Sequence, residues 1–265
     1  MKVLIVLAHP EILSLTSSLA QIAKETFEAK GDQVEVSDLY AMNWKSNVDR
    51  NDFLTYKSER LFICNASKNA TNEGRLTDDV IAEQKKLIWA DALLFVFPLW
   101  WFSAPAILKG WVERVFSYGV GYGVGTHNNV HWGDRYGEGT FVGKKAMVIT
   151  TAGGWQTHYS ARGVNGPIED LLFPINHGIL FYAGYTVLPP FVVFRSDSLD
   201  PKGFNLVSKE LKARITLFQE NQPIKYRKQN RGDYTIPNLE LLEDLNLEGS
   251  GFQQHIQEND EQYLG

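Results

Sequence analysis

Short apolar segments alternate along the chain with longer stretches of helical periodicity. The short segments either have the Val, Ile, Leu and Phe content of strands covered on both faces or alternate apolar and polar positions. They are residues 3–7, 34–36, 91–97, 145–150 and 185–194. The helical stretches are residues 15–30, 77–90, 103–117, 174–183 and 202–220. Because strand and helix alternate, the pattern predicts βαβ units and a parallel sheet.

The turn that follows residues 91–97 departs from ordinary loop composition. Residues 98–102 are Pro, Leu, Trp, Trp and Phe, where small polar residues are usual. We expect Ser103 to cap the next helix and Pro105 to lie in its first turn. Residue types leave two interpretations open. In the first, the strand extends beyond residue 97 and the tryptophans pack under a loop. In the second, the turn is a wall for a flat aromatic ligand such as a flavin, at the carboxyl end of a strand where ligands bind.

The loop from His9 to Thr16 follows the first strand and surrounds the start of the next helix with hydroxyl groups. The chain contains no GxGxxG and no P-loop motif. Backbone N–H groups at a helix N-terminus carry partial positive charge and suit an anion. The residues alone favour an ordinary Ser/Thr cap, and an anion site is the alternative.

Composition narrows the class of protein. The 265 residues carry a net charge of −5 with no basic block, which argues against nucleic acid as a partner. The one cysteine, Cys64, excludes an internal disulfide and a CxxC pair. We expect a cytoplasmic protein without membrane insertion, because no signal peptide and no run of about 20 apolar residues is present.

Three motifs carry a resemblance to a known family. FPLWWFSAPAILKGWVERVF resembles the FPLxWFxxPAILKGWxxRV signature of the flavin-dependent NAD(P)H:quinone reductases, the DT-diaphorase family. LAHPEILSLT is similar to the LAHPxxxSFN loop of that family, and TTAGG followed by Tyr159 is similar to its TTGG…Y segment. The similarity covers most of residues 1–220. It implies an α/β, flavodoxin-like, doubly wound parallel sheet of order 2-1-3-4-5, with FAD across the carboxyl ends of strands 1, 3 and 4.

The resemblance also implies an activity and an assembly. The activity is two-electron reduction of quinones by NADH or NADPH, through bound FAD rather than FMN, in a ping-pong hydride transfer. The assembly is a homodimer with active sites at the subunit interface. Two alternatives remain: an azo- or nitroreductase with FAD or FMN, and a regulatory flavoprotein subunit of a potassium-efflux system.

The family match assigns candidate residues by position. Cofactor contacts are expected from the three loops that carry the motifs: His9, Ser14, Leu15, Thr16, Pro98, Leu99, Trp100, Trp101, Phe102, Thr150, Thr151, Gly153, Gly154 and Tyr159. Substrate contacts are expected from aromatic and amide side chains: Trp101, Phe102, Tyr122, Asn165 and Tyr182. The resemblance places Tyr122 over the catalytic pocket and Tyr182 at an aromatic position of the pocket, to which the neighbouring subunit contributes aromatic residues.

The catalytic pair departs from the family. Mammalian members have a histidine six residues after the tyrosine, and this chain has Asn165. Asparagine donates and accepts hydrogen bonds but does not take up a proton near neutral pH. We therefore expect Tyr159 and Asn165 to stabilise negative charge while solvent supplies protons.

No metal site is expected. His127 and His131 have a helical ligand spacing, but the glycines and asparagines around them argue against a helix. In one branch of the family a metal site uses the helix at 174–183. His177 matches one of its ligands, but Phe181 stands where the second ligand would be.

Two polar regions complete the chain. Residues 41–76 are interpreted as a long, partly irregular excursion. Residues 1–220 are expected to form the FAD-binding catalytic domain, and residues 221–265 an arm that packs on this domain or on a dimer partner, because the arm has too few apolar groups for its own core.

Overall fold

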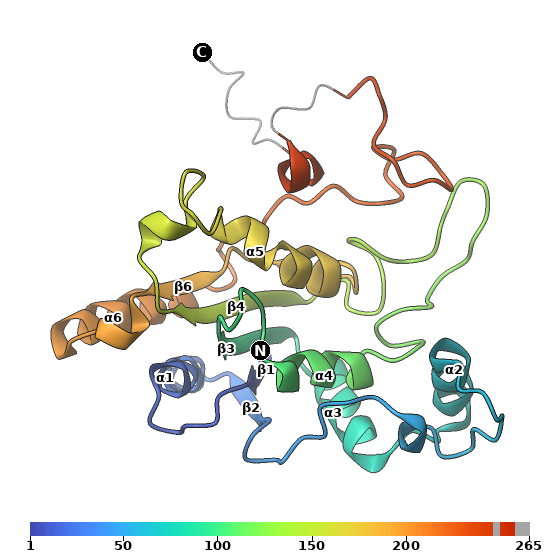
Figure 1. The fold of residues 1–265 in the computed structure, drawn as a ribbon, viewed down its shortest axis with the longest axis horizontal. Helices are drawn as coiled ribbons and strands as arrows, with labels where there is room; N and C mark the ends of the chain where they lie inside the picture. The colour runs from blue at the N-terminus through green and yellow to red at the C-terminus, as the bar shows by residue number, and fades with distance from the viewer. Residues whose placement is uncertain (246–249, 258–265) are drawn as a thin grey trace.

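The computed structural model describes residues 1–245 and 250–257 (Figure 1). The strands are β1 (Lys2–Leu7), β2 (Gln33–Asp38), β3 (Ala92–Pro98), β4 (Lys145–Ala152), β5 (Thr186–Val187) and β6 (Phe191–Phe194). The α-helices are α1 (Leu15–Ala29), α2 (Ile63–Glu73), α3 (Asp78–Trp89), α4 (Ala106–Val115), α5 (Ile168–Ile175) and α6 (Pro201–Thr216). The π-helical segment η3 (Asn176–Phe181) continues α5. The 3-10 turns are η1 (Arg50–Asp52), η2 (Gln156–Tyr159), η4 (Ser196–Ser198) and η5 (Gly251–His255).

The strands form one parallel sheet in the order β2-β1-β3-β4-β5, and β6 also pairs with β4. The predicted flavodoxin-like fold and strand order are confirmed. The predicted last strand, residues 185–194, is two strands that pair with the beginning and the end of β4. Pro189 and Pro190 separate them, since proline has no N–H to donate to a neighbouring strand.

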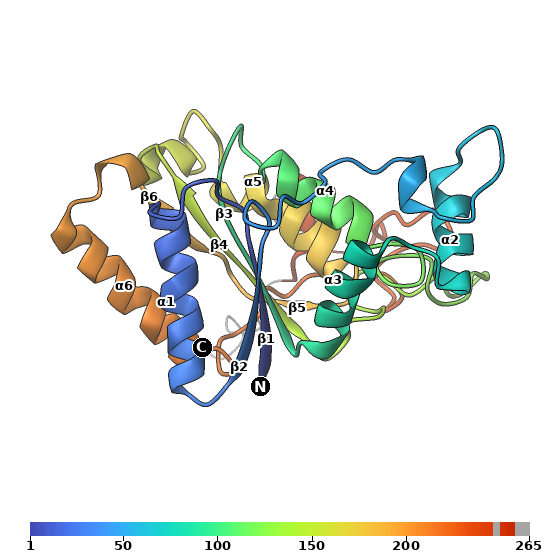
Figure 2. The same ribbon diagram turned by 90° about the horizontal axis from the view of Figure 1, so that it is seen from below.

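Helices cover both faces of the sheet. α1 and α6 lie side by side on one face, and α3, α4 and α5 cover the other (Figures 1 and 2). The layer of α1 and α6 contains the edge-on ring pair Phe27 and Phe218, with centroids 5.3 Å apart. The layer of α3, α4 and α5 is built around Trp111 of α4, which is fully buried against Phe95 of β3. Every residue of β3 is buried, as expected for a central parallel strand.

The excursion at residues 41–76 is more regular than predicted, because it contains η1 and the eleven-residue helix α2. The buried face of α2 consists of Ala66, Ser67 and Ala70, so no run of large apolar residues marks the helix in the sequence. Gly74, in the left-handed conformation at φ 64°, ends the helix, and this glycine is the local sequence signal for the helix end.

Two helices begin elsewhere than predicted. α4 begins at Ala106 with Pro105 at the N-cap position, so Ser103 is not the cap and instead closes the preceding turn. α5 begins at Ile168, six residues before the predicted start, and Pro174 lies inside it. Proline cannot donate to the carbonyl four residues back, and the helix continues beyond it with π-helical geometry.

The inward face of α3 includes a polar residue. Val80 and Leu87 of this helix are buried, whereas Ile88 is 53% exposed. Glu83 takes the inward position between them, where its carboxylate accepts a hydrogen bond from Trp111 Nε1 at 2.8 Å. A polar residue therefore belongs to the packed face, which an apolar periodicity cannot reveal.

The C-terminal segment packs on its own chain over the residues that the structure describes. Tyr226 and Phe252 contact Phe173 of α5, and Gln229 is buried against the loop before β4. Residues 246–249 and 258–265 of the predicted arm, including Leu247, lie outside the described residues. None of the helices in the described ranges combines the length and apolarity needed to cross a bilayer.

Candidate active site

The corner after β3 has a strained backbone. Trp100 and Ser103 exchange backbone hydrogen bonds, N–H to O=C, at 3.1 and 3.0 Å around a two-residue turn. The two central residues, Trp101 and Phe102, have φ values of 48° and 61°. Turns of this kind normally use Asn-Gly, because a side chain raises the energy of the left-handed conformation. Bulky rings at both positions are therefore unfavourable locally and need another explanation.

The rings of this corner point outward. Trp101 is 95% exposed and Phe102 is 47% exposed, although both are among the most apolar side chains of the chain. Leu99 anchors the corner to the sheet, since its N–H donates to the carbonyl of Thr151 at 2.8 Å. Exposed aromatic rings on a fixed, strained turn indicate a surface for a ligand or a partner.

The corner after β1 presents backbone donors. Ser14 caps α1, and its Oγ accepts from the N–H of Ser17 at 3.1 Å. The N–H groups of Leu15 and Thr16 have no acceptor among the described residues, so they are available to an anion at the helix N-terminus. The hydroxyl of Thr16 instead bonds to the hydroxyl of Thr151 at 2.9 Å, which fixes this corner to β4.

His9 connects the two corners. Its Nδ1 lies 3.0 Å from the N–H and 3.1 Å from the carbonyl oxygen of Glu11, and its Nε2 has no partner among the described residues. The ring lies 5.9 Å from that of Trp100, centroid to centroid. The free Nε2 of His9 is therefore available to a group that lies near the helix N-terminus and the aromatic turn.

The loop after β4 brings the third set of predicted residues to the same edge, where the turns after β3 and β4 project together in Figure 2. Gly153 is exposed and Gly154 half-buried, and a Cβ on Gly154 would lie 3.3 Å from the Tyr159 hydroxyl. A ligand can therefore approach the backbone closely beside a phenol. Thr150 is fully buried, and its Oγ has no partner among the described residues.

Asn165 lies beside Tyr159 through the backbone. Its N–H donates to the carbonyl of His158 at 3.0 Å, one residue before the tyrosine. The Asn165 side chain is half-buried and makes no hydrogen bond to a described residue. Both predicted catalytic side chains thus have free donors on one loop.

These three corners suit a flavin nucleotide. The predicted cofactor residues gather from β1, β3 and β4 at one edge of the sheet, with unpaired N–H groups, two exposed rings and a glycine turn. The rings match a flat tricyclic group, the N–H groups match a phosphate, and the glycines admit a polar ring edge.

Tyr122 and Tyr182 do not join this group within one chain. Tyr122 follows α4, which begins near the aromatic corner and is ten residues, or about 15 Å, long. Tyr122 packs edge-on against Tyr118 at 5.7 Å, and Tyr182 packs edge-on against Tyr136 at 5.0 Å. Burial raises the pKa of the Tyr122 phenol. The predicted second wall of the pocket is therefore a separate aromatic group.

Pattern reasoning missed the segment that supports this second group. α2 of the polar excursion lies against the loop that holds Tyr122. Ser67 Oγ accepts from the N–H of Tyr118 at 2.9 Å, and Lys68 lies 5.3 Å from the Tyr118 ring centroid. Only the polar residues of α2 make these contacts, so no apolar pattern could have indicated them.

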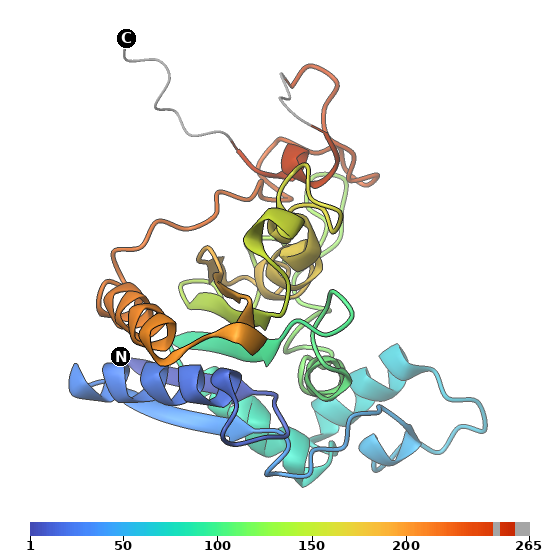
Figure 3. The same ribbon diagram turned by 60° about the vertical axis from the view of Figure 1, so that its left-hand side comes forward.

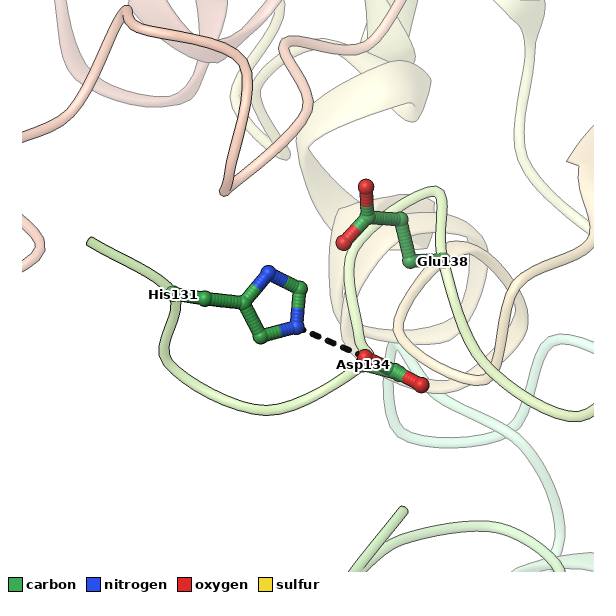
Figure 4. Close-up of side chains that lie close together, drawn as sticks. All are labelled: His131, Asp134 and Glu138. Carbon is green, nitrogen blue, oxygen red and sulfur yellow. Dashed lines mark hydrogen bonds and ion pairs between the residues drawn. The ribbon is translucent and has the colours of Figure 1, made fainter. Parts of the chain in front are cut away.

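The histidine-rich loop before β4 contains a cluster that spacing did not indicate. His131, Asp134 and Glu138 place one ligand-type atom each within 4.8 Å of one another (Figure 4). Protein groups already satisfy these side chains: His131 Nε2 lies 2.7 Å from Asp134 Oδ1, and Glu138 Oε2 accepts from Asn230 at 2.7 Å. The cluster joins the loop to the C-terminal segment.

The helix position that resembled a metal site of one family branch is aromatic. His177 stacks between Tyr136 at 4.7 Å and Phe173 at 4.4 Å, and Phe181 also packs against its ring. Burial lowers the pKa of His177 to about 4, and its Nε2 has no partner among the described residues. Its surroundings are those of a packed neutral ring.

Comparison with known proteins agrees with this geometry. Residues 1–215 match the family described as Flavodoxin-like fold. The chain is 56% identical over 244 residues to the ribosyldihydronicotinamide dehydrogenase-like protein traD of Penicillium crustosum, covering 92% of this chain and 90% of that protein. It is 39% identical over 227 residues to NAD(P)H dehydrogenase (quinone) 1 of Rattus norvegicus, covering 85% and 80%.

A solved structure is similar over nearly the whole chain. The protein is from Klebsiella pneumoniae, is provisionally assigned as a quinone reductase, and has a TM-score of 0.95 at 50% identity, covering 97% of this chain and 100% of that one. These similarities confirm the resemblance that the three motifs carry. The chain therefore belongs to the flavodoxin-like fold family, together with relatives named NAD(P)H dehydrogenase (quinone).

Proposed function

We propose that this protein catalyses the two-electron reduction of quinones by NADH or NADPH, with FAD as its bound cofactor. The observation that carries the proposal is the strained aromatic turn at Trp101 and Phe102, beside free N–H groups at the start of α1. Similarity to relatives named NAD(P)H dehydrogenase (quinone) and ribosyldihydronicotinamide dehydrogenase supports the same reaction.

Each corner has its own role in binding. The N–H groups of Leu15 and Thr16 and the Nε2–H of His9 would hold the diphosphate of the cofactor. The turn at Trp101 and Phe102 would form the wall against which flat groups stack. FAD, when bound, supplies the two-electron redox chemistry, and the protein supplies stacking, orientation and charge stabilisation.

Tyr159 and Asn165 stabilise charge in this proposal. The phenol O–H of Tyr159 and the amide N–H of Asn165 donate to an oxygen that becomes negative during reduction. The Asn165 amide cannot take up and release a proton, so water delivers the protons to the hydroquinone. The reaction therefore needs a pocket that is open to solvent at this loop.

A second copy of the chain would complete the pocket. Tyr122 follows α4, and Tyr182 precedes β5, which pairs with the start of β4 rather than with its carboxyl end. These rings would therefore cover the corner of a partner rather than their own. The nicotinamide donor would leave before the quinone enters the same place. One pocket used in turn gives ping-pong kinetics.

Cofactor identity and kinetics test the proposal. The purified protein is heated, and the released chromophore is identified by mass spectrometry, which separates FAD from FMN. Initial rates are then measured with NADPH and menadione at several fixed concentrations of each. We expect FAD and parallel double-reciprocal lines. A colourless protein that refuses added flavin contradicts the proposal, and intersecting lines contradict the shared pocket.

A further inference from the structure

Arg195 occupies a strained position at the edge of the candidate site. It is the first residue after β6, whose last pair with β4 joins Phe194 to Ala152. Its φ of 53° and ψ of 37° are left-handed, a conformation that favours glycine or asparagine. Its N–H donates to the carbonyl of Gly154 at 2.9 Å. The backbone therefore holds Arg195 beside the glycine turn that the proposed function uses.

The Arg195 side chain is oriented but not neutralised. Its guanidinium lies over the indole of Trp155 at 3.8 Å from the ring centroid, and that ring is 54% exposed. Within residues 1–245 and 250–257, no side chain forms an ion pair or hydrogen bond with the guanidinium. A guanidinium held over an aromatic face still has N–H donors available to another group.

The acidic residue closest to Arg195 in the sequence does not pair with it. Asp197 follows two residues later, and one of its carboxylate oxygens accepts from Ser196 Oγ at 3.1 Å. The other would lie 3.1 Å from a Cβ on Gly153, so the carboxylate covers the glycine turn. Asp197 thus opposes an anion at this edge without pairing with Arg195.

We propose that Arg195, held on Trp155, binds a phosphate group of a dinucleotide at this edge of the site. The planar guanidinium matches phosphate oxygens in pairs, which explains why arginine rather than glycine occupies the left-handed position. This inference rests on the proposed function, in which both FAD and NAD(P)H carry diphosphates. The cofactor and the donor are the two sources of the same chemistry, and the measurements below separate them.

The test uses Arg195→Asn, because asparagine tolerates the left-handed backbone and removes the charge. Lys212→Asn, on the exposed side of α6, is the control for net charge. The dissociation constant of FAD is measured by flavin fluorescence on the apoprotein. KM values are measured for NADPH and for dihydronicotinamide riboside, which carries no phosphate.

Loss of the charge-assisted contact should change about tenfold either the dissociation constant of FAD or the ratio of the KM for NADPH to the KM for the riboside. A weaker FAD complex assigns the phosphate to the cofactor. A higher ratio of the KM for NADPH to the KM for the riboside assigns it to the donor. Lys212→Asn should leave both quantities within about twofold, and Asp197→Asn should shift the affected quantity in the opposite direction.

Equal values for Arg195→Asn and the unsubstituted protein in both measurements would overturn the inference. If Arg195→Asn fails to fold, Trp155→Leu removes the ring beneath the guanidinium and should give a smaller loss of the same kind. Absence of turnover with every donor in the unsubstituted protein refutes the proposed function instead, and the FAD measurement still decides the role of Arg195.

Discussion

The two corners that follow β1 and β3 solve the same structural problem in opposite ways. After β1, Ser14 caps α1 with its own hydroxyl, and the backbone is unstrained. After β3, two consecutive left-handed aromatic residues form the turn, and Pro105 stands at the N-cap position without a side-chain hydrogen bond. The first corner is stable by itself, and the second is held by the sheet beneath it.

The difference in backbone strain between the two corners indicates which of them needs a ligand to account for its residues. Local hydrogen bonds explain every feature of Ser14, so a ligand is not needed to account for it. Nothing inside the described part of the chain accounts for the exposure of Trp101 or the conformation of Phe102. Strain of this kind persists where the surroundings impose it, and it gathers at binding sites.

The largest effect is expected from replacing the aromatic turn by the residues that its backbone favours. In the double variant Trp101→Asn/Phe102→Gly, we expect quinone reductase activity to fall about 100-fold or more, since the stacking surface is gone. We also expect the apoprotein to become about 1 to 2 kcal/mol more stable, since two left-handed side chains are relieved. Activity is measured with NADPH and menadione, and stability by urea unfolding.

Leu54→Asn serves as the control for removing an exposed apolar side chain, because Leu54 is 60% exposed and lies in the excursion. Leu54→Asn should change neither the quinone reductase activity nor the free energy of unfolding appreciably. A double variant that loses stability and keeps its activity would mean that the rings are packing residues, and the contrast between the corners would disappear.

The stability of the whole protein depends on pH through His177, so variants of the two corners must be compared at the same pH. Burial lowers the pKa of His177 from 6.5 to about 4, so the unfolded chain binds a proton more readily between these values. Stability is therefore full above about pH 6.5 and decreases as the pH falls towards 4. The contribution is on the order of 2 kcal/mol after allowance for partial exposure.

Thermal unfolding of the unsubstituted protein and of His177→Gln between pH 4 and 7 measures this contribution. Glutamine does not titrate, so the difference between the two proteins should shrink as the pH falls. A constant difference would show that His177 keeps its ordinary pKa.

Tyr159 tests whether the third corner stabilises charge. In Tyr159→Phe, kcat with menadione should fall about tenfold, because one of two donors to the developing negative oxygen is lost. The KM for NADPH should change less, since the ring remains. A purely structural role would instead lower the unfolding temperature with kcat unchanged.

The smallest effect is expected at the first corner. Ser14→Ala removes the cap of α1 and should lower the free energy of unfolding by about 1 kcal/mol. The sign is opposite to that expected for the double variant of the second corner. Urea unfolding of Ser14→Ala, with Ser14→Asn as the variant that keeps a cap, measures it. If Ser14→Ala equals the unsubstituted protein, the first corner is not locally stabilised.

Local patterns predicted the elements whose own residues form a clear apolar run or a clear helical periodicity. The strands at β1 and β3 are continuous apolar runs, and α1 has both a cap and a periodic face, so these elements were found at nearly their full extent. α2 was not, because its packed face of Ala66, Ser67 and Ala70 resembles a solvent-exposed helix face. The pattern at residues 174–183 predicts a helix that begins six residues late, because Pro174 suits a helix start and is in fact an interior residue of α5.

The candidate site shows the same limit. The residue types at 98–102 contradict ordinary loop composition and so indicate this corner, whereas the remaining positions follow only from the family resemblance. Sequence could not reveal that Thr16 bonds to Thr151, which lies 135 positions away. It also could not reveal the ring of Trp155 beneath Arg195, because Trp155 lies in the loop after β4 and Arg195 follows β6.

The sequence alone determined the alternation of strands and helices, the order of the sheet through its family motifs, and the three loops that hold the candidate residues. Tertiary structure decided that Trp101 and Phe102 are strained and exposed, and that Tyr122 and Tyr182 lie apart from them. It also decided that the Arg195 guanidinium lies over Trp155 with no hydrogen-bond or ion-pair partner within the described residues. Periodicity and motifs report contacts between neighbours in the chain. Strain, exposure and unpaired charge depend on contacts between distant residues, and only the folded chain defines those.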